Sequence, residues 1–172
     1  NNGLLSKQLA SLLRMEIISK SYPINRPDDN KKITYEINDN LLRFYYAFVY
    51  RNKSALHMLG AQAFYEEYIE PALITFISFR FEELCRTYFS LLAHAGKLKG
   101  VTNIGTYYYD DATTRTSGEY DVVLQRRSAY DVYEVKYFAS VMPKSKIEAE
   151  AAKIRSIKGL QLGKIGFITV HG

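Results

Sequence analysis

The pattern of hydrophobic and polar positions changes character near Gly96. Upstream, residues 72–95 (ALITFISFRFEELCRTYFSLLAHA) are apolar over most of a helical circumference, which predicts a central helix. Downstream, short β-branched and aromatic stretches between polar turns predict strands at 101–110, 118–125, 130–138 and 164–170. Residues 143–158 predict a helix with an Ile and Ala stripe. The order from residue 72 onward is therefore α-β-β-β-α-β, a mixed α/β (α+β) arrangement.

The first 38 residues predict the second half of a winged helix. Leucines at helical spacing mark residues 4–15 as a helix, and strand-like segments flank the polar loop RPDDNKK, which would be the wing. One interpretation makes residues 4–15 a DNA-recognition helix through Lys7 and Arg14. The other makes them an interdomain packing helix. We favour packing, because the helix offers few groove-reading side chains and the wing carries two aspartates.

Between these regions, Asp39 or Asn38 is expected to cap a long helix at 40–59, and Pro71 to open the next one. The aromatic run FYYAFVY could be a base-stacking platform, but its helical spacing favours core and interdomain packing. The predicted organisation is a partial winged helix (1–38), connecting helices (39–71) and a third domain (72–172).

Composition narrows the functional classes. The 172-residue chain is 47% hydrophobic, lacks an apolar run long enough to cross a membrane, and predicts a soluble cytoplasmic protein. One cysteine and three scattered histidines argue against a disulfide or structural zinc, and GLQLGK has the wrong spacing for an ATP-binding phosphate loop. A net charge of +5 is compatible with nucleic acid. The missing initiator Met and the strand-like end suggest a piece of a longer protein.

Three charged residues stand among apolar ones in the stretch from 117 to 138. Alternation places Glu119, Asp121 and Val123 on one strand face, and on the next strand Glu134 and Lys136 share a face with Val132 and Phe138. If the strands pair antiparallel around residues 126–129, Gln125 faces Tyr130 and Asp121 falls opposite Glu134.

Two facing carboxylates repel each other and call for a compensating charge. Mg²⁺ or Mn²⁺ would supply it, because these ions favour oxygen ligands. Lys136 could then orient or help deprotonate a metal-bound water, or stabilise a pentavalent phosphate, which indicates phosphodiester hydrolysis. The alternative is a solvated strand face with a cross-strand ion pair between Asp121 and Lys136.

The spacing D-x(12)-E-x-K, on the second and third strands of an α-β-β-β-α-β unit, resembles the PD-(D/E)XK nuclease superfamily, which includes many restriction enzymes. The resemblance implies a restriction-endonuclease-like core with Asp121 and Glu134 as metal ligands and Lys136 at the attacking water. It also implies a further acid and metal ligand from the first helix, with Glu82 in that place and Glu83 as the weaker substitute. The superfamily's Pro before the first Asp is absent, and Tyr120 stands there.

A second resemblance covers nearly the whole chain. The segments YEINDNLLRFYYAFVYRNKS, FEELCRTYF, EYDVVL and YEVKYF, in this order, resemble the C-terminal half of archaeal-type AAA ATPases that are also found in bacteria. This implies an ATPase domain and the first winged-helix helices upstream of residue 1. It also implies DNA as a partner, with Lys7, Arg14, Lys144 and Lys146 as candidate contacts. Cutting both strands with one such site would favour a homodimer.

Three functions are therefore weighed for the chain. The first is a metal-dependent nuclease. The second is a catalytically silent DNA-binding or regulatory module of the ATPase, and the third is a sequence-specific regulator acting through the winged helix.

Overall fold

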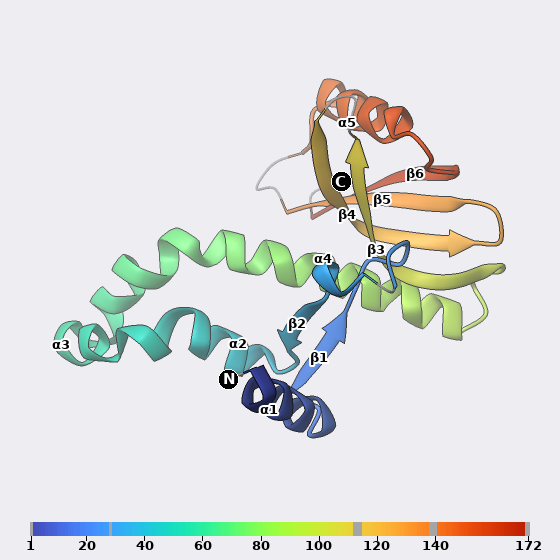
Figure 1. Ribbon diagram of the computed structural model, residues 1–172. Helices are drawn as coiled ribbons and strands as arrows, with labels where there is room; N and C mark the ends of the chain where they lie inside the picture. The colour runs from blue at the N-terminus through green and yellow to red at the C-terminus, as the bar shows by residue number, and fades with distance from the viewer. Residues whose placement is uncertain (1, 28, 112–114, 138–140, 171–172) are drawn as a thin grey trace. The chain divides into compact units, whose positions relative to one another are not determined.

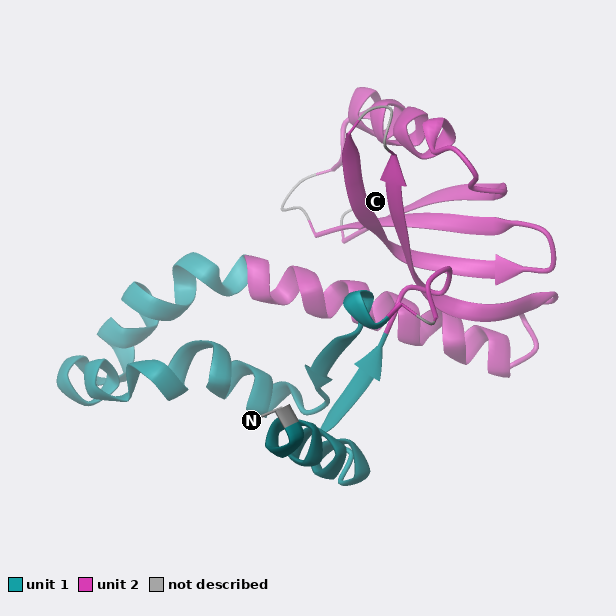
Figure 2. Cartoon of the chain, in the orientation of Figure 1, with its two compact units in different colours: residues 1–21, 30–74 teal, residues 22–29, 75–172 magenta. Residues whose placement is uncertain are grey.

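The computed structural model describes residues 2–27, 29–111, 115–137 and 141–170. The chain forms two compact units, coloured separately in Figure 2. Unit 1 comprises residues 1–21 and 30–74, and unit 2 comprises residues 22–29 and 75–172. The long helix α4 (Glu70–His94) contains the boundary between them.

Unit 2 is built on a four-stranded mixed sheet (Figure 1). Its strands lie in the order β3 (Val101–Asp111), β4 (Thr116–Arg126), β5 (Tyr130–Lys136) and β6 (Leu162–Thr169). β3, β4 and β5 pair antiparallel, whereas β6 runs parallel to β5 after the connecting helix α5 (Lys144–Ser156). The predicted order α-β-β-β-α-β is confirmed, because the strand alternation and the two helical stripes were strong local signals.

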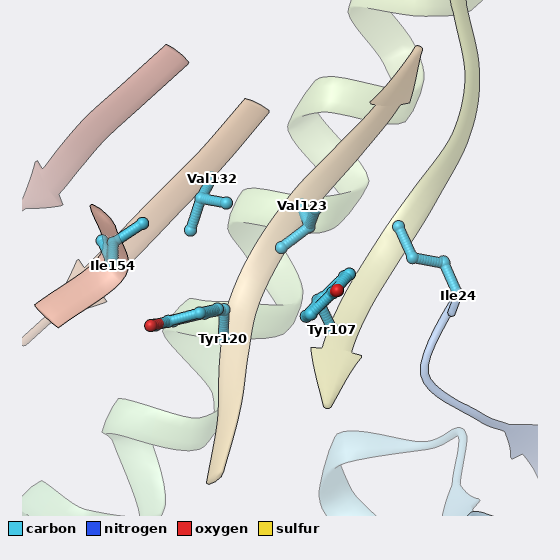
Figure 3. Close-up of a cluster of buried hydrophobic side chains, with 6 residues drawn as sticks. All are labelled: Ile24, Tyr107, Tyr120, Val123, Val132 and Ile154. Carbon is cyan, nitrogen blue, oxygen red and sulfur yellow. The ribbon is translucent and has the colours of Figure 1, made fainter. Parts of the chain in front are cut away.

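Each face of this sheet buries a separate apolar cluster. Val123 and Val132 pack with Ile154 of α5, and Figure 3 shows these side chains together with Tyr107, Tyr120 and Ile24. The cluster on the other face joins the sheet to α4. It contains Cys85 and Phe89 of the helix and Val122, Leu124 and Val135 of the sheet. Because neighbouring strand residues point to opposite sides, α4 and α5 cover opposite faces of β4 and β5.

A buried acid fixes the hairpin between β4 and β5. Asp131 is 1% exposed, and its carboxylate forms an ion pair with Arg126 at 2.6 Å. The same carboxylate accepts a hydrogen bond from the backbone N–H of Lys164 on β6 at 3.0 Å. A Cβ atom at Gly163 would lie 2.4 Å from Asp131 Oδ1, so the close approach of β6 requires glycine there. Asp131 thus locks three strands together by its hydrogen bonds, and its role is structural.

The segment 22–29 belongs to unit 2 and lies against β3. Ile24 N–H donates to Thr106 O at 2.8 Å, and the Asn25 side chain exchanges two hydrogen bonds with the backbone of Tyr108. Ile24 is buried in the cluster of Figure 3. Residues 24 and 25, at the end of the strand-like segment that precedes the predicted wing loop RPDDNKK, therefore contact the sheet. Asp28, one of the two aspartates of that loop, lies outside the described residues.

Unit 1 begins with α1 (Asn2–Arg14) and a two-stranded antiparallel sheet of β1 (Ile18–Ser21) and β2 (Thr34–Ile37). The predicted helix, strand, loop and strand are confirmed as elements, with a short 3₁₀ turn (Asn30–Lys32) in the loop. The leucine stripe of α1 is only partly covered: Leu4 and Leu5 are exposed, whereas Leu9, Leu12 and Leu13 are half-buried.

The prediction of one long helix over residues 40–59 is wrong. Asp39 caps α2 (Asn40–Phe44) by accepting the Leu42 N–H at 2.7 Å, as predicted, but the helix then widens into a π-helical turn (Tyr45–Val49) and tightens into a 3₁₀ turn (Tyr50–Asn52). The helix α3 (Lys53–Phe64) follows, with a kink at Gly60, whose φ of 74° favours glycine. A second π-helical turn (Tyr65–Ile69) leads into α4.

The apolar circumference of α4 predicted a central helix, but only part of that circumference is covered. One side packs on the sheet through Cys85 and Phe89, but several large apolar side chains remain exposed. These are Ile74, Phe79, Leu84, Tyr88 and Leu91. The apolar pattern predicted that this segment is helical, but it did not predict how much of the helix surface other elements cover.

Candidate active site

The candidate site lies where β4 and β5 separate. Their backbone pairs run from Gln125–Tyr130, which confirms the predicted register, to Val122–Tyr133. At the next position, the carboxylate of Asp121 accepts a hydrogen bond from the backbone N–H of Val135 at 3.2 Å. The Asp121 side chain therefore lies at the fork between the strands and bonds to the backbone of β5.

A β-bulge orients Asp121. Between the pairs Gly105–Val123 and Tyr107–Tyr120, β4 advances by three residues while β3 advances by two. Tyr120 and Val123 consequently pack in the same cluster, which strict alternation forbids (Figure 3). Bulges of this kind redirect a side chain and are frequent beside functional sites.

The bulge overturns one prediction. Glu119 neighbours Tyr120 and so faces the side opposite to Val123, although simple alternation placed Glu119 and Val123 on one face. A bulge adds one residue to a strand without a characteristic side chain, so the sequence pattern alone did not reveal the bulge in β4.

Glu134 and Lys136 stand two residues apart on β5 and form a direct ion pair. Lys136 Nζ lies 2.6 Å from Glu134 Oε1, and the Glu134 side chain is only 12% exposed. The alternative prediction of an ion pair between Asp121 and Lys136 is therefore wrong in its partner, because the lysine binds Glu134. Phe138, predicted to share this strand face, lies outside the described residues.

The helix α4 contributes Glu82 and, one turn later, Arg86. Arg86 Nη1 donates to the backbone carbonyl of Asp121 at 2.8 Å, which ties the bulge to the helix. Burial raises the pKa of Glu82 above its ordinary value, and repulsion from Glu134 adds to this, while Arg86 and Lys136 oppose it. Glu82 is thus in electrostatic reach of both β5 side chains. Arg86 was missed from the sequence, although its spacing of four from Glu82 places both on one helix face.

The surroundings of Asp121 raise the pKa of its carboxyl group. Burial raises the pKa of Asp121 from its ordinary 3.8 to about 7, and the negative charges of Glu82 and Glu134 add to this. The Val135 N–H and Lys136 act in the opposite direction. Asp121 is therefore within electrostatic reach of Glu82 and Glu134, and a positive charge placed nearby would stabilise its ionised form.

Lys136 is affected in a different way. Burial alone would lower the pKa of Lys136, but its hydrogen bond and charge attraction with Glu134, followed by attraction to Asp121 and Glu150, leave that pKa above the ordinary value. The lysine is therefore a cation at neutral pH. Glu150 of α5 is a further neighbour that the sequence did not indicate.

The remaining predicted residues lie elsewhere. Glu83 forms an ion pair with Arg80 at 2.8 Å on the same helix. Lys7 and Arg14 lie on α1 in unit 1, and both are exposed. Lys144 and Lys146 lie on the first turn of α5, exposed, and Lys144 approaches Glu148 at 3.9 Å.

The described part of the chain has no group of three or more His, Cys, Asp or Glu side chains in an arrangement that could hold a metal ion. None of the helices described combines the length and apolarity that crossing a membrane requires.

Comparison with known proteins gives one match. The model of the DUF234 family, described as archaeal and bacterial proteins of unknown function, matches residues 45–153, well over half of the chain. The matched range contains Glu82, Arg86, Asp121, Glu134 and Lys136. No curated protein and no solved structure matched the chain. On the extent of the family match, the chain belongs to the DUF234 family.

Proposed function

We propose that unit 2 is a restriction-endonuclease-like domain that hydrolyses DNA phosphodiesters with Mg²⁺ or Mn²⁺. The single observation that carries the proposal is the strand fork, where the half-buried Asp121 carboxylate accepts a hydrogen bond from the Val135 N–H, within electrostatic reach of Glu82, Glu134 and Lys136. The element order and the D-x(12)-E-x-K spacing support the same assignment.

Asp121 and Glu134 are the proposed metal ligands, with Glu82 as an outer acid. Their donor set suits a hard divalent cation, because all three groups present carboxylate oxygens and repel one another without a cation. Glu134 would have to exchange part of its bond with Lys136 for the metal. When bound, the ion would polarise the phosphate and lower the pKa of a coordinated water.

The protein's own groups would place the reacting atoms. Lys136, kept protonated by its surroundings, would donate a hydrogen bond to the attacking water or to a phosphate oxygen, and it would stabilise the negative charge that develops there. Arg86 would hold the Asp121 backbone, and hence the bulge, in position. In the reaction, the water oxygen bonds to phosphorus and one phosphorus–oxygen ester bond breaks.

The wider organisation is also a proposal. Residues 1–38 would be the remnant of a winged helix that follows an AAA-type ATPase domain, and Lys144 and Lys146 would contact the DNA backbone near the site. Their exposure on α5, the helix that also carries Glu150, supports this role. Cutting both strands would involve a homodimer.

A catalytically silent regulatory module is the second candidate. The 2.6 Å ion pair between Glu134 and Lys136 favours it, because each charge already has a partner, and so does the lack of a three-residue metal group among the described residues. The two candidates differ in one property, which is cleavage.

Incubation with supercoiled plasmid and with single-stranded DNA separates them. We expect nicking with Mg²⁺ or Mn²⁺ and none when EDTA removes the metal. Glu134→Gln should lose the activity, whereas Glu148→Gln, on the exposed side of α5, is the matched control and should keep it. Equal nicking by wild type and Glu134→Gln would contradict the proposed site, and no nicking by any protein would favour the silent module.

A further inference from the structure

A group of tyrosines gathers around the π-helical turn of unit 1. In this turn the Tyr50 N–H bonds to the Tyr45 carbonyl, five residues earlier, so residues 45 and 50 lie on the same side of the helix. The rings of Tyr45 and Tyr50 have centroids 6.1 Å apart, and those of Tyr46 and Tyr50 are 5.0 Å apart. We call Tyr45, Tyr46 and Tyr50 the tyrosine patch. π-Helical turns are frequent at functional sites.

The tyrosine patch differs from its apolar neighbours in exposure. Phe48 is buried in unit 1, as the packing interpretation of this aromatic run predicts, but Tyr46 is 49% exposed and Tyr50 is 51% exposed. Core packing is therefore wrong for these two side chains, and their packing against another domain stays a prediction. Large aromatic surface facing water beside cations marks a candidate contact surface.

Positive charge accompanies the rings. Lys53 Nζ lies 4.9 Å from the centroid of Tyr50 and 5.7 Å from that of Tyr45, within the range of cation–π contacts. Arg51 is exposed next to Tyr50. From residue 40 to residue 65 the chain contains not a single Asp or Glu, and Arg51, Lys53 and His57 are exposed there, whereas Arg43 is buried and pairs with Glu36. The partner of this surface is therefore expected to be anionic.

We infer that the tyrosine patch, with Arg51 and Lys53, binds single-stranded nucleic acid: bases stack on Tyr46 and Tyr50, and the two cations contact phosphates. Exposed aromatic rings beside basic side chains are the usual platform for single strands, because every base has a flat face and every nucleotide a negative charge. In a duplex the base faces are already stacked on one another and are not accessible to tyrosine. An acidic peptide or an anionic membrane would satisfy the cations but gives the rings no flat partner.

This inference goes beyond the proposed hydrolysis and stands even if the carboxylate site is silent. The residues lie inside the range matched by the family model, and they are entirely within unit 1. Binding is measured in EDTA, so that its failure and a failure of cleavage are distinguishable.

The test is fluorescence anisotropy of labelled oligo-dT titrated with the full 172-residue chain. We expect wild type to bind the single strand more tightly than a duplex of equal length. Tyr46→Ala and Tyr50→Ala should each weaken binding about tenfold, and Tyr46→Phe/Tyr50→Phe should restore it, since the rings remain. Lys53→Gln should make the dependence of log affinity on log salt shallower by about 0.7.

Tyr35→Ala is the matched control, because Tyr35 is an exposed tyrosine on β2 of the same unit. Equal affinities for wild type and a Tyr46→Ala/Tyr50→Ala double variant would overturn the inference. The inference would also be overturned if wild type bound anionic phosphatidylserine vesicles but not oligo-dT, and if the same double variant lost the binding to vesicles. If the alanine variants do not fold, the charge reversals Arg51→Glu and Lys53→Glu replace them, and unchanged affinity in those would contradict the inference.

Discussion

Asp121→Asn is expected to stabilise the metal-free protein at pH 8 by about 2–4 kcal/mol. In the folded protein the pKa of Asp121 is about 7, whereas an unhindered aspartate has an ordinary pKa of 3.8. Each pH unit between these two values is worth about 1.4 kcal/mol, which makes about 4 kcal/mol the upper end. The asparagine removes the charge and keeps an oxygen that can accept the Val135 N–H.

The direction of the pH dependence follows from the raised pKa. Below pH 4 the group is protonated in both states, and the contribution of this side chain to stability is fully present. As pH rises to 7, the unfolded state ionises first, so wild type loses stability relative to Asp121→Asn. The difference in the free energy of unfolding should therefore shrink when the pH falls from 8 to 5.

Urea unfolding in EDTA at several pH values measures this difference. Asp110→Asn, at an exposed position of β3, is the matched control and should give a much smaller and flatter effect. An Asp121→Asn protein that is less stable than wild type at pH 8 would show that the carboxylate is better accommodated than the geometry implies.

Lys136→Ala is expected to reduce metal-dependent DNA cleavage by about a hundred- to a thousand-fold. The reason is that Lys136 is the cation next to Glu134, at 2.6 Å, and would stabilise charge developing on the phosphate. Lys136→Arg should recover little of the rate, because a planar guanidinium does not occupy the position of a compact ammonium. The readout is the rate of plasmid nicking at saturating DNA.

Two controls accompany the Lys136 variant. Lys164→Ala, at an exposed position on β6, should cleave like wild type. DNA affinity and the circular dichroism spectrum of Lys136→Ala should remain close to wild type, and Lys136→Gln replaces it if the alanine variant unfolds. Cleavage at the wild-type rate by a folded Lys136→Ala protein would remove this lysine from the mechanism.

Much of unit 2 was predictable from the sequence because its signals are local. Alternating β-branched and aromatic residues predicted β3 to β6, and the residues between β4 and β5 predicted the register Gln125–Tyr130 that the structure confirms. That register by itself brings Asp121 to the neighbourhood of Glu134. Glu82 followed only from the resemblance to the PD-(D/E)XK superfamily, which implies an acid on the preceding helix.

The parts that were not predictable depend on tertiary contacts or on small backbone changes. The bulge at Asp121 adds one residue without changing the types of side chain around it, so alternation failed between Glu119 and Val123. The π-helical turn likewise keeps the residue types of an α-helix but shifts Tyr45 and Tyr50 into line. Arg86 acts on the backbone of Asp121, and hydrogen bonds between distant segments leave no periodic pattern.

Calorimetric titration of Mn²⁺ into the metal-free protein at pH 8 tests the central proposal most directly. The carboxylates at the strand fork predict saturable binding of Mn²⁺ by wild type, and this binding should be lost in Asp121→Asn. The urea unfolding measurement checks that the Asp121→Asn protein is folded. Saturable binding that is equal in the two proteins would place the ion elsewhere. A wild-type protein that binds no Mn²⁺ would contradict the metal-dependent site.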